Sequence, residues 1–97
     1  MIYSVTPDLY RETASRLLDA LDASGYFSGS LFFPFGDTDC RLTASIIVYR
    51  TIVEAPDGVS RPVADMMPVW WEFHTVAPEG EVLNDFSFNV LRDYVCG

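Results

Sequence analysis

The first quarter of the chain alternates hydrophobic and polar positions with the period of an α-helix. Apolar residues recur along one helical stripe at Tyr10, Ala14, Leu17, Leu18 and Leu21. Thr6 suits the N-cap, and Pro7 suits the first helical position. Ser24 and Gly25 provide a stop, because glycine tolerates the left-handed conformation after a helix. The pattern predicts a helix over residues 7–23.

From Tyr26 onward the helical period disappears, and aromatic and β-branched residues predict strands. Three segments have this character, and they span residues 26–35, 40–54 and 61–76. Short polar turns separate them, which favours an antiparallel meander in the order 1-2-3. Pro68 lies inside the third segment and cannot donate to a ladder, so it indicates a bulge or a strand at the sheet edge.

The last segment carries two competing signals after the break at residues 77–80. Asn84 or Asp85 could cap a helix, whereas Phe86-Ser87-Phe88 alternates as a strand does. We favour a helix over residues 82–95. The prediction is therefore one α+β domain over residues 1–97, with the order α-β-β-β-α and a three-stranded antiparallel sheet flanked by helices.

The predicted strands place large apolar side chains on both faces of the sheet, although a sheet with one solvated face should alternate cleanly. One face is a full core face, and the second carries Phe32, Tyr49, Met66 and Trp70. Helices on both faces, a groove for a small molecule, or a partner on the second face would each explain this. We favour a partner, because aromatic residues and Met are enriched at interface cores and two-fold homodimers are common. A bulge at Pro68 would switch the face of part of the third strand.

Composition excludes several classes of protein. The 97 residues are 49% hydrophobic and carry a net charge of −8, with arginine as the only basic residue type besides one histidine. Such a chain is too hydrophobic to be disordered, too acidic to bind nucleic acid or anionic lipid, and lacks an apolar run that could span a membrane. The first residues lack a signal-peptide pattern, which predicts a cytoplasmic protein whose two cysteines stay reduced.

Candidate chemistry is sparse. His74 follows Glu72 by two residues, so a carboxylate and an imidazole would share one strand face, as general acid–base catalysis requires. A Cys40–His74 nucleophile pair needs the two strand ends to meet. No motif for a phosphate, a metal or another cofactor is present, so no cofactor is predicted.

These observations predict a small cytoplasmic, non-enzymatic protein that acts in protein interaction or regulation. It would self-associate through the apolar sheet face, as a homodimer, or bind another protein there. Two alternatives stay open. One is a small-molecule-binding or hydrolytic domain with a pocket near Glu72 and His74, and the other is an acidic mimic of nucleic acid.

Overall fold

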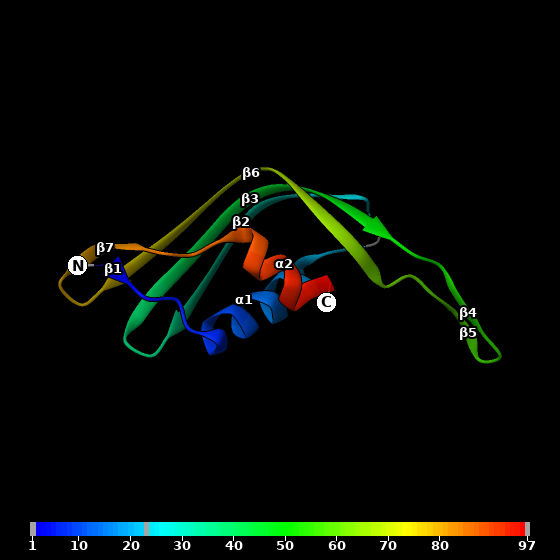
Figure 1. Ribbon diagram of the computed structural model, residues 1–97, viewed down its shortest axis with the longest axis horizontal. Helices are drawn as coiled ribbons and strands as arrows, with labels where there is room; N and C mark the ends of the chain where they lie inside the picture. The colour runs from blue at the N-terminus through cyan, green and yellow to red at the C-terminus, as the bar shows by residue number, and fades with distance from the viewer. Residues whose placement is uncertain (1, 23, 97) are drawn as a thin grey trace.

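The computed structural model describes residues 2–22 and 24–96, and its sheet arches over two helices (Figure 1). The elements, in chain order, are β1 (Ile2–Tyr3), α1 (Pro7–Ala20), β2 (Tyr26–Phe35), β3 (Thr38–Arg50), β4 (Val53–Ala55), β5 (Gly58–Ser60), β6 (Val63–Ala77), β7 (Gly80–Asn84) and α2 (Phe88–Cys96). The α+β class and the largely antiparallel sheet are confirmed.

The main sheet has five strands in the order β1-β7-β6-β3-β2, so the predicted three-stranded sheet is incomplete. The long strands β2, β3 and β6 are antiparallel neighbours, and β7 pairs with β6 through residues 75–77. β1 pairs with β7 in parallel, which makes the sheet mixed. The predicted third strand is therefore not an edge strand along its whole length.

Both helices lie beneath the concave face of the arched sheet (Figure 1). α1 packs against α2 and β2, and α2 packs against β6. Neither helix covers the convex face, which we call the outer face. The sequence left open whether helices cover both faces of the sheet. In the structure both helices lie on one face, so they do not account for the apolar side chains of the outer face.

Helix α1 begins as predicted and ends earlier. The Thr6 side chain accepts a hydrogen bond from the Leu9 amide, and Pro7 occupies the first turn. The helix ends at Ala20 rather than at residue 23, because the backbone is already extended at Leu21. Asp22 then accepts a hydrogen bond from the Ser24 amide at 2.7 Å, a local turn that competes with the helix. Residue 23 lies outside the described residues.

The predicted second strand is divided between β3 and β4, whereas the predicted third strand corresponds to β6 and begins two residues later than expected. β3 ends at Arg50 and β6 begins at Val63, whereas β4 and β5 form a separate two-stranded hairpin at one end of the molecule (Figure 1). The Arg50 guanidinium donates to the carbonyl of Arg61 and to that of Asp22, and so ties the base of this hairpin to the loop after α1.

The start of the predicted C-terminal helix is wrong, because residues 80–84 form strand β7. A two-residue turn at Pro78 and Glu79 folds the chain back, so that Ala77 faces Gly80 in the ladder. Asn84 secures the strand by donating to the Phe73 carbonyl and to the Thr75 hydroxyl. The helix begins only at Phe88.

The core lies between the helices and the concave face of the sheet. Its largest fully buried side chains include Leu9, Leu17, Leu42, Ile46, Met66, Phe88 and Leu91. Phe86 links the layers, since its ring stacks on Phe73 with centroids 4.0 Å apart and also on Tyr10. Among the described residues, no helix is both long enough and apolar enough to cross a membrane.

Candidate functional site

A bulge at Val69 determines which side chains of β6 reach the outer face. Ser45 of β3 faces Trp70, but the next residue, Ile46, faces Pro68, so Val69 is an extra residue without a partner. One extra residue reverses the alternation of the strand. Trp70 and Met67 therefore lie on the same face, although they are three positions apart, a spacing that puts side chains on opposite faces of a regular strand.

The outer face carries a cluster of exposed apolar side chains near the β4–β5 end of the sheet. Tyr26, Ile47 and Met67 occupy one row across β2, β3 and β6, because Tyr26 pairs with Ile47 and Ile47 pairs with Met67. We define the outer patch by the five residues that the pairing places on this face, Tyr26, Ile47, Tyr49, Met67 and Trp70, together with the exposed bulge residue Val69. Five of them are exposed apolar residues, and Ile47 is half-buried.

The structure places two of the four predicted interface residues in this patch. Tyr49 and Trp70 are 46% and 48% exposed. The prediction for Met66 is wrong. Met66 lies on the core face and is fully buried, because the bulge at Val69 reverses the alternation of the β6 residues that precede Val69. Met67 takes its place outside. Pro68 indicated a bulge from the sequence, but alternation alone could not place the bulge at Val69.

Phe32 is 70% exposed on the outer face but lies outside the patch. It is six residues along β2 from Tyr26, or roughly 20 Å. Hydroxyl groups fill the interval, with Ser28 contacting Ser45 at 3.2 Å and Ser30 contacting Thr43 at 2.8 Å. The outer face therefore has a polar band between the outer patch and Phe32.

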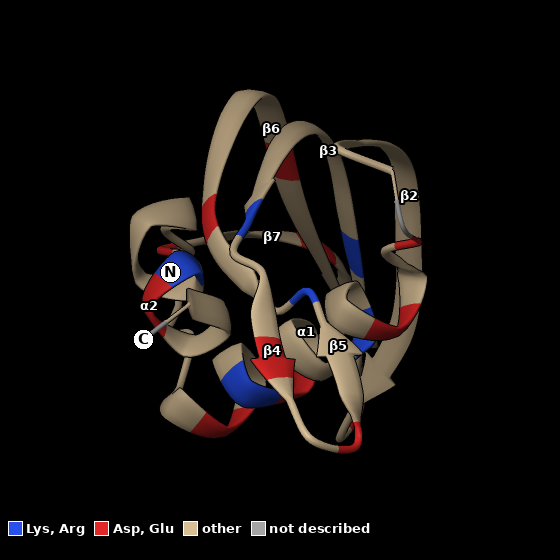
Figure 2. Cartoon of the chain, turned by 90° about the vertical axis from the view of Figure 1, so that its right-hand side faces the viewer, with Lys and Arg blue, Asp and Glu red and all other residues tan. Residues whose placement is uncertain are grey.

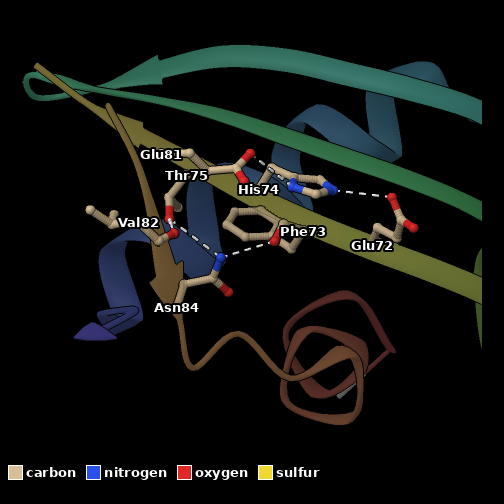
Figure 3. A network of polar contacts seen from close by, with 7 residues as sticks. All are labelled: Glu72, Phe73, His74, Thr75, Glu81, Val82 and Asn84. Carbon is tan, nitrogen blue, oxygen red and sulfur yellow. Dashed lines mark hydrogen bonds and ion pairs between the residues drawn. The ribbon is translucent and has the colours of Figure 1, made fainter. Parts of the chain in front are cut away.

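The alternative polar site is present as a hydrogen-bonded triad. His74 Nε2 lies 3.0 Å from Glu72 Oε2, and His74 Nδ1 lies 3.2 Å from Glu81 Oε1 (Figure 3). The sequence pointed to Glu72, whereas Glu81 comes from β7, the strand that was not predicted. Each ring nitrogen of His74 lies within hydrogen-bond distance of a carboxylate, so the triad links β6 to β7.

Two small cavities adjoin His74. The first, about 140 Å³, lies on the outer face and is lined by Phe32, Asp39, Cys40, Arg41, His74, Val76 and Glu81. The second, about 280 Å³, lies where β6 and β7 part and is lined by Trp71, Phe73, His74, Glu81, Val82, Leu83, Asn84 and Phe86. Glu72 lines neither cavity. Arg41, which sequence reasoning missed, places its guanidinium 5.9 Å from the centre of the Phe32 ring.

The Cys40–His74 nucleophile pair does not form. Cys40 pairs with Thr75 on the core face, whereas His74 pairs with Arg41, so the two side chains leave the sheet on opposite faces. Burial raises the pKa of the Cys40 thiol to about 11, with a smaller contribution from the Asp39 carboxylate. The thiol is therefore protonated and a poor nucleophile near neutral pH. In the described part of the chain, no group of three or more potential metal-ligating residues gathers.

Acidic residues are distributed over all parts of the molecule. Red segments in Figure 2 mark Asp and Glu on the helical layer, on the sheet and on the β4–β5 hairpin. Arginines neutralise some of them locally, as in the pairs of Asp8 with Arg11 and of Glu12 with Arg16. This distribution lacks the continuous stripe of carboxylates that a mimic of duplex DNA needs.

Comparisons of the chain with protein-family models, with curated proteins and with solved structures find no match.

Proposed function

We propose that this chain is a small, non-enzymatic interaction protein that binds another protein through the outer patch. The observation that supports the proposal is the exposure of Trp70, Met67 and Tyr49 together on a sheet face that neither described helix covers. Exposed apolar patches on soluble proteins mark interaction sites, and Trp, Tyr and Met are enriched in interface cores. Trp70 and Tyr49 are the expected anchors of the contact.

The curvature of the sheet bears on the shape of the partner. The outer face is convex (Figure 1), so two copies packed face to face would touch only near their crests. A partner with a concave surface would bury the whole patch. We therefore propose a different protein as the occupant of the outer patch, and treat self-association separately below.

A photo-crosslinking experiment tests this proposal. A photoreactive amino acid at Tyr49 should give a crosslinked product of defined mass in cells that express the chain, and Trp70→Ala should reduce its yield by about tenfold or more, as expected for a hot-spot tryptophan. The variant should stay folded and lose less thermal stability than a core truncation, because Trp70 is half exposed.

Leu83→Ala is the matched control, because Leu83 is 75% exposed but lies on β7 away from the patch. The product should persist in this variant. If the product forms equally in Trp70→Ala, or if a photoreactive group at Leu83 captures the same protein, the outer patch is not the contact surface.

A second candidate function is the binding of a small carboxylate beside His74. The supporting observation is the 140 Å³ cavity, where the Arg41 guanidinium and the Phe32 ring lie side by side. The Arg41 Nε atom is buried and has no hydrogen-bond partner among the described residues. A guanidinium next to an aromatic ring suits an aromatic carboxylate.

Benzoate is a direct probe for this second candidate. It should shift the amide NMR signals of Arg41 and His74 in the wild type, and Arg41→Ala should abolish these shifts. Acetate serves as the control for the aromatic contribution. Shifts that persist in Arg41→Ala, or an absence of shifts at millimolar benzoate, would exclude a carboxylate site in this cavity.

A further inference from the structure

The free edge of the sheet at β2 has an unusual composition. Its ten residues, Tyr26–Phe35, include no charged side chain, whereas β3 carries three and β6 carries two besides His74. Edge strands are normally protected by charges, prolines or bulges against pairing with another chain. β2 has only Pro34 near one end, and Ser28, Gly29 and Ser30 in its middle are all exposed. The middle of this edge is therefore open to a partner strand.

The hydrogen-bond pattern identifies the backbone groups that face the free edge. The Val48 amide donates to the Gly25 carbonyl at 2.9 Å, which makes these two residues a hydrogen-bonded pair. Such pairs alternate along an antiparallel ladder. In the register of β2 with β3, the odd-numbered residues of β2 therefore bond to β3, and the even-numbered residues direct their amides and carbonyls to the free edge.

Ser24 supports this assignment independently. Its hydroxyl accepts from the Tyr26 amide at 3.0 Å and donates to the Tyr26 carbonyl at 2.8 Å, so the outward groups of Tyr26 are already satisfied. Pro34 has no amide to donate. The hydroxyls of Ser28 and Ser30 turn toward β3 instead of covering the edge. Ser28, Ser30 and Phe32 thus have edge-facing backbone groups that no other described residue pairs with.

We infer that β2 pairs with β2 of a second copy of this chain, antiparallel and centred on Ser30. In this register Ser30 faces Ser30 of the other copy and Ser28 faces Phe32, and each pair exchanges two backbone hydrogen bonds. The same register sets Tyr26 opposite Pro34. Pro34 has no amide to donate, and the amide and carbonyl of Tyr26 already bond to the Ser24 hydroxyl. The edge is therefore complementary to itself at its centre, and at its ends it leaves no amide donor without a partner.

Side chains fit this pairing on both faces. On the outer face, the exposed Tyr26 ring meets Pro34, and no like charges are opposed, because the strand is uncharged. On the core face Leu31 faces Gly29 of the other copy, where the lack of a side chain leaves room. A two-fold axis normal to the sheet relates the copies. Both helical layers then lie on one side. Of the outer patch only Tyr26 takes part in the pairing, so Tyr49, Met67 and Trp70 stay open to the partner proposed above, on which this inference does not depend.

Sedimentation equilibrium of the full chain tests the pairing. The wild type should reach twice the mass of one chain as its concentration rises. Ser30→Lys should remain monomeric at the same concentrations, because it places two ammonium groups opposite each other at the axis. Ser60→Lys, which makes the same change of charge on an exposed residue of β5, should dimerise as the wild type does.

Disulfide trapping gives a positive test that does not depend on weakening the dimer. Hydrogen-bonded partners in antiparallel strands have Cα atoms about 5.5 Å apart, which a disulfide can bridge. In a Cys96→Ser background, Ser30→Cys should crosslink to itself when oxidised glutathione accepts the electrons. Ser28→Cys should not, because its neighbour across the axis is Phe32. Cys40 is buried and should not interfere.

Three outcomes would overturn the inference. They are a wild type that sediments as a single chain at every concentration, a Ser30→Lys variant that dimerises normally, and a folded Ser30→Cys variant that does not crosslink. Trp70→Ala distinguishes this inference from the proposed function. The variant should lose the photo-crosslinked partner protein but still form the β2–β2 dimer. Loss of the dimer in Trp70→Ala but not in Ser30→Lys would move self-association to the outer patch.

Discussion

Met66→Ala should lower the free energy of unfolding by about 2–5 kcal/mol, whereas Met67→Ala should change it by less than about 0.5 kcal/mol. Met66 is fully buried on the core face and faces Val48, so truncation leaves a cavity that the packed core cannot close. Met67 is 51% exposed on the outer face. Urea unfolding followed by circular dichroism measures both effects.

The two methionines are adjacent and chemically identical, so each variant is the control for the other. Unbroken alternation along residues 61–76 places Met67 in the core and Met66 outside, which is what the sequence predicted. The order of the two effects therefore reports whether the bulge at Val69 is present. A larger loss for Met67→Ala would contradict the bulge and, with it, the composition of the outer patch.

The C-terminal segment provides the second large effect. Leu91→Ala should cost about 2–5 kcal/mol of stability, because Leu91 is fully buried where α2 packs into the core. Leu83→Ala should have little effect, since Leu83 projects from β7 and is 75% exposed. Urea denaturation midpoints at equal protein concentration give the comparison.

This pair tests the division of the segment into a strand and a helix. A continuous helix over residues 82–95 sets Leu83 and Leu91 within about 80° of each other on the helix surface, so both would contribute to one apolar face. Equal losses in the two variants would support that helix. A loss confined to Leu91→Ala would support a strand that ends at Asn84.

The sequence by itself determined the features that depend on neighbouring residues. The start of α1 followed from Thr6 and Pro7, whose effects are local capping and a preset backbone angle. The bounds of β2 were predicted exactly as observed, because a glycine before it and a turn after it enclose an aromatic run. The apolar surplus on a second sheet face was also visible in the alternation, and Tyr49 and Trp70 do lie there.

Only the tertiary structure decided how these elements combine. β7 exists because β6 offers it a ladder and Asn84 finds acceptors on Phe73 and Thr75, contacts that no local pattern in residues 80–84 reveals. The bulge at Val69 likewise depends on the register of β6 against β3, and a single extra residue moved Met66 inside and Met67 outside. Periodicity reports the alternation of side chains within a strand, but only pairing between strands defines which side chains face the core.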